Sequence, residues 1–144
     1  MEEIDFHHSL PIQLRFNDVD KFGHVNNAVY FTFYDLGKTE YFSSVCPNVD
    51  WTKDGIVVVN IEANFLSPIF PTNRIAVQTA VSEIGHKSFH LIQQVVDVNT
   101  HEVKCICKSV MVTFDLKKNE SKELEEEWVE AICRYEKRDL RKKQ

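Results

Sequence analysis

The residues RFNDVDKFGHVNNAVYFTFYDLGKTEYF (15–42) organise this chain. Their first half is dense in Asn, Asp and Gly, which favour turns because they tolerate left-handed or side-chain-bonded backbone. From Ala28 onward there is no proline, and apolar residues recur at helical spacing, with Gly37 small enough to allow close approach of a neighbour. Aromatic residues widen this apolar stripe, so we expect the helix to be enclosed. The stretch predicts a polar turn followed by a long helix, capped by Asn26 or Asn27.

Length and composition indicate one globular domain over residues 1–144, with 43% hydrophobic and 27% charged residues. No apolar run approaches the roughly 20 residues of a membrane span. The start of the chain carries Glu2, Glu3 and Asp5, which is the wrong charge for a secretory signal, so we expect a cytoplasmic protein. The net charge of -5 argues against nucleic-acid binding. The four cysteines form no C-x-x-C pair, and we interpret them as reduced core residues.

Strand signals flank the predicted helix. Residues 8–16 alternate apolar and polar side chains before it, and four β-rich segments follow it at 55–66, 74–84, 87–98 and 102–115. Within 55–66, alternation predicts that one face carries Val57, Val59, Ile61, Ala63 and Phe65. Short turns between the later strands imply antiparallel neighbours. We therefore predict an α+β fold, in which an antiparallel sheet of about five strands wraps one long central helix (core about 8–116) and a peripheral helix covers about 121–138.

The turn before the helix suggests chemistry. Asp20 lies a few residues before a helix N-terminus, whose unpaired N–H groups carry partial positive charge. Hydrolysis of an activated carbonyl needs a general base or nucleophile on one side and a donor for the developing oxyanion on the other. Asp20 and a free N–H near Asn27 would supply both without a metal ion. The alternative is that Asp18 and Asp20 only shape the turn and cap the helix, which is common for an isolated D-x-D motif.

The longer string 18–30, DVDKFGHVNNAVY, resembles the active-site segment of the hot-dog-fold acyl-CoA thioesterases, the family that includes 4-hydroxybenzoyl-CoA thioesterase and related long-chain acyl-CoA thioesterases. The family pattern is D-x-D-x-x-G-H/V-V, followed by a short polar stretch and a Tyr on the helix. Residues 83–89 look like the family's G-x-x-S hairpin, and the resemblance covers roughly 10–116. Two departures are Asp35, where relatives usually carry Glu, and the pair 37–38, Gly-Lys, where Ala-Arg is commoner.

The resemblance implies a hot-dog fold and hydrolysis of an acyl-CoA thioester to a free acid and coenzyme A. Asp20 matches the catalytic carboxylate, acting as general base or nucleophile. Asn27 matches the position whose backbone N–H polarises the thioester carbonyl. His24 would serve in catalysis, either by direct proton transfer or as an orienting hydrogen-bond partner, and with Asn26 would shape the pocket mouth. Tyr30 would form one wall.

Further substrate contacts are predicted at the hairpin. Lys87 and Ser88 could meet the phosphates of coenzyme A, and His86 lies beside them. We expect no metal site, because His86 and His90 would diverge on a hairpin and no Cys or Asp completes a set of ligands. We also expect no cofactor other than the coenzyme A of the substrate. The resemblance also implies a homodimer or homotetramer with each site at a subunit interface, in line with the open edge that a single curved sheet would leave.

Three alternatives remain. HVNN (24–27) is also reminiscent of acyl-carrier-protein thioesterases, although those typically join two hot-dog repeats in one chain. A hydratase or dehydratase on this fold would want Asp and His spaced as D-x-x-x-x-H, a spacing that this motif does not have. A module that binds acyl-CoA without turning it over is the non-enzymatic alternative.

Overall fold

The computed structural model describes residues 4–141, so Glu2 and Glu3 lie outside the described residues. The elements in chain order are β1 (His8–Ile12), the short 3-10 helix η1 (Phe16–Asp18), α1 (Asn27–Val45), β2 (Asp54–Phe65), β3 (Ile75–Ile84), β4 (Ser88–Asp97), β5 (Val103–Asp115), β6 (Glu120–Ser121) and α2 (Glu126–Glu136). The strands form one antiparallel sheet in the order β1-β3-β4-β5-β2, with the two-residue β6 paired to β5. The turns predicted at 85–86 and 99–101 are both present, as antiparallel connections that span 85–87 and 98–102.

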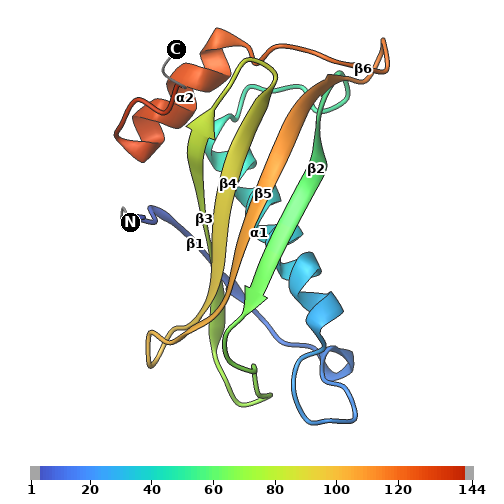
Figure 1. Cartoon of the computed structure of the whole chain (residues 1–144), viewed down its shortest axis with the longest axis vertical. Coiled ribbons are helices and arrows are strands. Elements are labelled where there is room, and N and C mark those ends of the chain that lie inside the picture. The colour runs from blue at the N-terminus through green and yellow to red at the C-terminus, as the bar shows by residue number, and fades with distance from the viewer. Residues whose placement is uncertain (1–3, 142–144) are drawn as a thin grey trace.

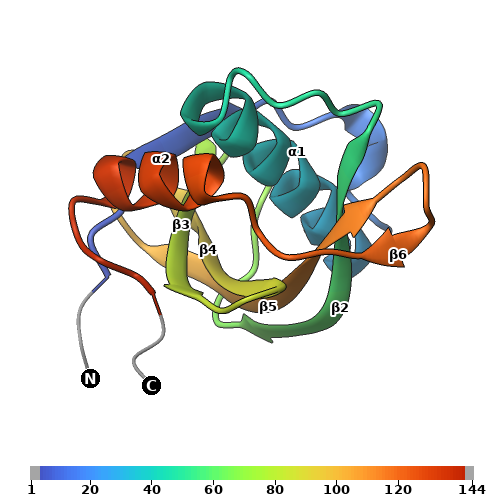
Figure 2. The same cartoon turned by 90° about the horizontal axis from the view of Figure 1, so that it is seen from above.

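The sheet curls around α1, which lies along its concave side, while α2 sits over the end of β3 (Figures 1 and 2). Two clusters of buried side chains fill the space between helix and sheet. One gathers around Tyr30 and Phe33 near the start of α1, and the other joins Tyr41 and Phe42 to α2. This arrangement confirms the predicted α+β fold. None of the helices in the described part of the chain is long and apolar enough to cross a membrane.

The middle of α1 approaches the sheet very closely at Gly37. A Cβ atom there would lie 2.6 Å from Cγ1 of Val77 and 3.1 Å from Oγ1 of Thr79. The Gln93 side-chain Nε2 donates to the backbone carbonyl of Tyr34 at 2.9 Å, which ties the helix to β4 at the same level. The predicted role of Gly37 in close packing is therefore confirmed, and the usual alanine could not fit this backbone unchanged.

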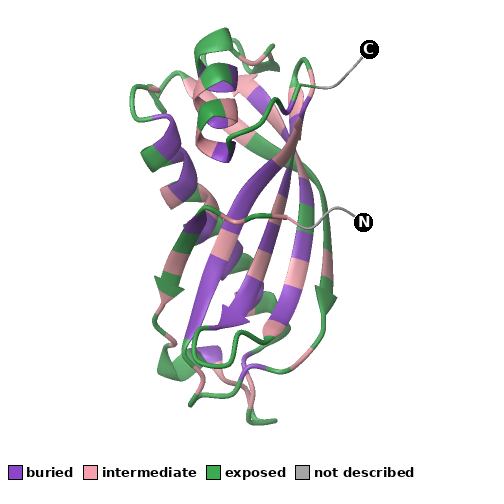
Figure 3. Cartoon of the chain, turned by 90° about the vertical axis from the view of Figure 1, so that its left-hand side faces the viewer, coloured by how far each residue is buried: buried purple, intermediate pink, exposed green. Residues whose placement is uncertain are grey.

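The helix is less enclosed than the aromatic pattern predicted. Leu36 is 49% exposed and Phe31 is 38% exposed, because the sheet covers only one side of α1. Figure 3 shows the consequence, with buried residues concentrated along the middle strands and green patches along the helices. The enclosure predicted from sequence is incomplete in a single chain.

Strand β2 corrects a second prediction. A β-bulge lies at Val59, since Val58 pairs with Met111 while Asn60 pairs with Val110. Cross-strand partners share a face of the sheet, and Met111 is fully buried on the concave side. Val57 and Val59 therefore do not continue the face of the later apolar residues, because the extra residue shifts the alternation. The concave face of β2 instead carries Ile56, Val58, Ile61, Ala63 and Phe65.

The C-terminal helix is present but shorter than predicted. It begins at Glu126 because the preceding backbone is extended and bonds to the sheet, with the Lys122 N–H donating to the Thr113 carbonyl at 3.0 Å. A buried carboxyl anchors its other end. Glu136 accepts a 2.5 Å hydrogen bond from the Tyr41 hydroxyl and a 3.2 Å bond from the Val81 N–H. Burial raises the pKa of Glu136 against the opposing effect of these bonds.

Candidate functional site

The turn before α1 is a small hairpin. Val19 and Val25 form an antiparallel bridge, and the Asp20 N–H donates to the His24 carbonyl at 3.1 Å. At its tip Gly23 has φ +89°, a conformation that side chains with a Cβ rarely adopt. The two strands of this hairpin carry Asp20 on one side and lead directly into the start of α1 on the other. The hairpin thus joins Asp20 to the start of α1 through residues 21–26 alone.

Asp18 builds the base of this hairpin. Its buried carboxylate accepts hydrogen bonds from the Arg15 N–H at 2.8 Å, Nε at 3.0 Å and Nη2 at 2.8 Å, while its carbonyl accepts from the Asn26 N–H at 2.9 Å. Burial alone would raise the pKa of Asp18, but the hydrogen bonds and charge of Arg15 outweigh it and hold that pKa below its usual value. From the sequence, either aspartate could only shape the turn. The hydrogen bonds of Asp18 fit that role.

Asp20 is placed differently. Its Oδ1 accepts a 2.9 Å bond from the Phe22 N–H, and its Oδ2 bonds to none of residues 4–141. The residue is partly exposed and borders a cavity of about 680 Å³, whose other lining residues are Leu14, Arg15, Phe16, Asn17, Val19 and Pro71. A carboxylate with one unengaged oxygen beside an open cavity can accept a proton from water or attack a carbonyl carbon.

The start of α1 keeps one donor available. Asn26 is the N-cap, and its Oδ1 accepts from the Ala28 N–H at 2.9 Å. The Val29 N–H donates to the Asn26 carbonyl at 2.9 Å. The backbone N–H of Asn27, the first helical residue, has no acceptor within the described part of the chain, as is usual at a helix start. Such an N–H, together with the helix dipole, can stabilise negative charge on a substrate oxygen.

His24 and Tyr30 flank this end of the helix without touching the Asp20 carboxylate. The His24 ring packs edge-on against Phe70 with centroids 5.8 Å apart. Tyr30 is buried, its ring lies edge-on to Phe65 at 5.1 Å, and burial raises its pKa to about 12. Tyr30 is therefore a neutral core side chain at ordinary pH.

The predicted coenzyme A contacts lie elsewhere. His86 and Lys87 belong to the connection between β3 and β4, and Ser88 begins β4. This connection is at the top of Figure 1, whereas the segment before α1, which contains Asp20, is at the bottom. The His86 carbonyl accepts from the Leu124 N–H at 2.8 Å, so this hairpin is tied to the segment before α2. One chain does not bring these residues to Asp20.

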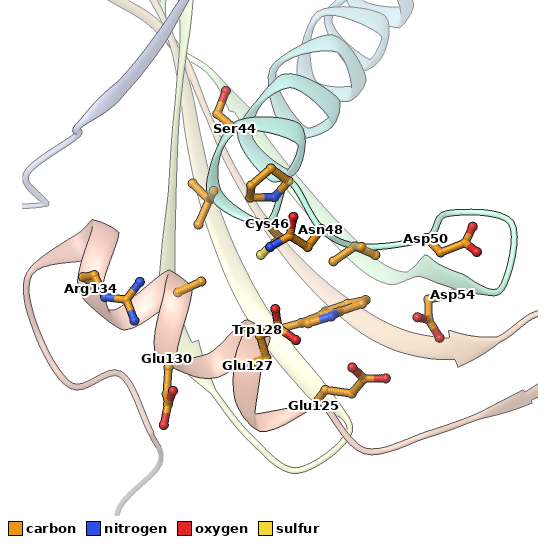
Figure 4. Close-up of a pocket in the computed structure, with 14 residues that line it drawn as sticks. Ser44, Cys46, Asn48, Asp50, Asp54, Glu125, Glu127, Trp128, Glu130 and Arg134 are labelled. Atoms are coloured by element: carbon orange, nitrogen blue, oxygen red, sulfur yellow. The ribbon is translucent and has the colours of Figure 1, made fainter.

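Sequence reasoning also missed two features. A cavity of about 590 Å³ lies between the end of α1 and α2 (Figure 4), and its lining carries Asp50, Asp54, Glu125, Glu127, Glu130 and one cation, Arg134. Burial, with the nearby charge of Glu127, raises the pKa of the lining thiol Cys46 to about 11. A pocket with this charge and a protonated thiol is unsuited to a phosphate-bearing ligand or to nucleophilic attack. Because its walls come from segments far apart in sequence, no local motif could have indicated it.

The second missed feature is exposed aromatic surface beside Asp20. Phe16, the first residue of η1, is 97% exposed, and Phe22, in the hairpin closed by Val19 and Val25, is 71% exposed. Large apolar side chains this exposed mark a surface for contact. The same region has no metal cluster, since no group of three or more His, Cys, Asp or Glu residues within 4–141 could hold a metal ion. The four cysteines are all free, as predicted.

Known proteins resemble the chain over most of its length. Residues 14–132 match the Thioesterase-like superfamily. A solved thioesterase from Thermus thermophilus, complexed with coenzyme A and Zn, is 27% identical with a TM-score of 0.82, covering 94% of this chain and 98% of that one. The probable thioesterase YbaW of Escherichia coli is 26% identical with a TM-score of 0.73, covering 87% and 96%.

A further relative is named for its carrier. The chloroplastic acyl-acyl carrier protein thioesterase ATL2 of Arabidopsis thaliana is 26% identical over 113 residues, which are 76% of this chain and 60% of that protein. The chain thus spans less than two-thirds of the length of this relative. With the match over residues 14–132 and the sheet wrapped around α1, the chain belongs to the thioesterase-like superfamily and has its hot-dog fold.

Proposed function

We propose that this protein hydrolyses the thioester of an acyl-CoA to a free carboxylic acid and coenzyme A. The observation that carries the proposal is the pairing at the start of α1. The Asp20 carboxylate keeps one oxygen unengaged beside a cavity, and the hairpin that holds it leads directly to the unpaired N–H of Asn27. Membership of a thioesterase-like superfamily supports the reaction class.

The chemistry follows from these two groups. The thioester carbonyl oxygen accepts from the Asn27 N–H, where the helix dipole stabilises the charge that develops during attack. Asp20 either takes a proton from water that attacks the carbonyl carbon, or attacks that carbon itself to form an anhydride that water then hydrolyses. In both routes the thiolate of coenzyme A leaves and takes up a proton. His24 orients the turn through its carbonyl, which accepts from the Asp20 N–H.

The test is Asp20→Asn, which keeps the shape of the side chain and removes its charge. We expect thiol release from acyl-CoA to fall by a factor of about 10² to 10⁴, the usual contribution of a general base, with unchanged thermal unfolding. Glu130→Gln, an exposed carboxylate on α2, is the matched control and should leave turnover unchanged. Unchanged turnover in Asp20→Asn would refute the assignment. A single turnover in ¹⁸O-labelled water tests the covalent route. An unlabelled product acid with the label in Asp20 shows attack by Asp20 followed by hydrolysis at the aspartyl carbonyl, whereas direct water attack always labels the product acid.

We further propose that the active unit is at least a homodimer paired along β2. This strand is at the sheet edge, and Val59 on it is 58% exposed. Antiparallel pairing of two β2 strands would place the end of one sheet that carries Lys87 beside the end of the other that carries Asp20. This supports a substrate-binding role for His86, Lys87 and Ser88 in the partner's site.

The dimer is tested by light scattering on Val59→Lys, which puts a charge on the edge strand. The variant should be monomeric and should have a raised KM for acyl-CoA. Thr72→Lys, an exposed position in the β2–β3 connection, is the control. A wild-type protein that is monomeric at all concentrations would contradict the proposal.

An acyl-acyl carrier protein is the second candidate substrate, favoured by the name of the Arabidopsis relative. Comparing kcat/KM for the same acyl group on coenzyme A and on acyl carrier protein decides between the carriers. Retention of acyl-CoA by the wild type with no thiol release would instead indicate a binding module.

A further inference from the structure

The segment that carries Asp20 is the first strand of the small hairpin before α1, and its pairing has a fixed register. The Asp18 carbonyl accepts from the Asn26 N–H at 2.9 Å, and the Asp20 N–H donates to the His24 carbonyl at 3.1 Å. These two bonds flank the single antiparallel bridge of the hairpin. Because Asn27 directly follows the paired strand, the pairing sets where the Asp20 backbone stands relative to the first N–H of α1.

The two strands of this hairpin are attached to the rest of the molecule in different ways. In the strand that leads into α1, the Val25 N–H donates to the Ile69 carbonyl at 2.8 Å, and both residues are buried. In the strand that carries Asp20, Val19 is only partly buried against the core. The buried residue of that strand is Asp18, whose side chain is 1% exposed. The attachment of the Asp20 strand therefore depends on a buried carboxylate.

The Arg15 side chain makes the burial of that carboxylate possible. The Arg15 N–H, Nε and Nη2 donate to the Asp18 carboxylate at 2.8, 3.0 and 2.8 Å, and the Asp18 N–H donates to the Arg15 carbonyl at 3.0 Å. A buried charge that loses its partner is strongly unfavourable, and it regains water when its segment moves outward. Loss of the Arg15 guanidinium should therefore displace the strand that carries Asp20.

We propose that Arg15 is a positioning residue, which through Asp18 holds Asp20 in its place relative to the Asn27 N–H. This inference rests on the proposed thioesterase function. Arg15 also lines the cavity beside Asp20, so a direct contact with the substrate is the alternative. The two roles differ in their kinetics, because a positioning residue changes the rate of the chemical step whereas a substrate contact changes affinity.

The first test is Arg15→Met, which removes the guanidinium and keeps a long side chain. We expect kcat for acyl-CoA to fall by a factor of about 10 to 100, the order of the loss for a misplaced catalytic group, with KM unchanged. Arg15→Lys should recover part of the loss, since an ammonium group keeps Asp18 paired without the planar fork of the guanidinium. Lys21→Met is the control and should leave kcat unchanged, because this exposed ammonium group beside Asp20 lies over the Phe22 ring and pairs with no carboxylate of residues 4–141.

A double variant shows whether Arg15 acts through Asp18. Arg15→Met combined with Asp18→Asn removes both charges, so that no unpaired carboxylate stays buried. Its kcat should be no lower than that of Arg15→Met alone, whereas independent effects would multiply. Multiplied losses, or a raised KM with unchanged kcat in Arg15→Met, overturn the inference.

Amide hydrogen exchange followed by NMR tests the same placement without an activity assay. In Arg15→Met the Asp20 and Asn26 N–H groups should exchange at least about tenfold faster than in the wild type, because the strand pairing opens locally. The Val25 N–H, which is bonded to Ile69, should keep its protection and reports that the variant is folded. The same comparison on Arg15→Lys, which keeps the buried charge paired, covers the case in which Arg15→Met does not fold.

The outcomes of the two assays separate the two proposals. Unchanged exchange at Asp20 and Asn26 overturns the inference, and so does faster exchange with unchanged kcat. Faster exchange in a protein whose wild type hydrolyses no acyl-CoA would refute the thioesterase and would still support the role of Arg15 in placing Asp20.

Discussion

The contact between α1 and the sheet at Gly37 makes a sharp prediction about stability. In Gly37→Ala the new methyl group would lie 2.6 Å from Cγ1 of Val77, 3.1 Å from Oγ1 of Thr79 and 3.3 Å from Nε2 of Gln93. All three neighbours are buried. Real Cβ atoms essentially never approach another heavy atom as closely as the first of these distances, so the Val77 side chain, the helix or the strand must shift.

Two opposing effects set the size of the change. Alanine stabilises a helix interior by about 1 kcal/mol relative to glycine. Inserting a methyl group into a packed core costs about 1–3 kcal/mol, and the upper half of that range applies because the nearest neighbour is a fully buried β-branched side chain, Val77. We therefore expect Gly37→Ala to lower the free energy of unfolding by about 1–2 kcal/mol, measured by urea denaturation.

Two further variants isolate the cause. Ser43→Ala, at an exposed position of α1 whose hydroxyl bonds to none of the described residues, should be neutral or slightly stabilising, since only helix propensity changes there. Val77→Ala removes the clashing Cγ1, so the double variant with Gly37→Ala should be more stable than the sum of the two single effects by about 1 kcal/mol or more. A Gly37→Ala protein as stable as the wild type, or strictly additive effects, would refute the close-packing argument.

Two buried carboxyls give pH-dependent predictions. Asp18→Asn should lower the free energy of unfolding at neutral pH by about 2 kcal/mol, because Arg15 loses its charged partner. Since the pKa of Asp18 is lowered by folding, its contribution to stability is present above the ordinary pKa of 3.8 and is lost as the pH falls. Chemical denaturation should therefore show that the difference in stability between variant and wild type shrinks in acid. The stability contribution of Glu136 depends on pH in the opposite direction, because burial raises its pKa above the ordinary 4.5. Its contribution is present below pH 4.5 and is lost as the pH rises. Glu136→Gln should therefore flatten the decline of stability above about pH 4.5, and an unchanged pH profile would contradict the assignment.

The regular parts of the fold were predictable because their signals are local. The helical spacing after Ala28 and the turn residues between strands each act over a few positions, and both appear where the sequence indicates them. The bulge at Val59 was not predictable, because Val57, Val58 and Val59 suit either face equally and only pairing with β5 selects one. For the same reason the enclosure of α1 was overestimated at Leu36, whose exposure depends on how far the sheet curls.

The sequence by itself determined that Asp20 comes a few residues before the start of the helix, because the turn residues and the helical spacing after Ala28 are local signals. Only the tertiary structure decided that the Asp18 carboxylate is hydrogen-bonded to Arg15 while Asp20 keeps an unengaged oxygen, since this depends on which of the two carboxylates is buried. Only the tertiary structure, too, placed the β3–β4 connection and the turn before α1 at opposite ends of the molecule (Figure 1). These are contacts and distances between segments far apart along the chain, and they follow from strand order and register, which no short motif encodes.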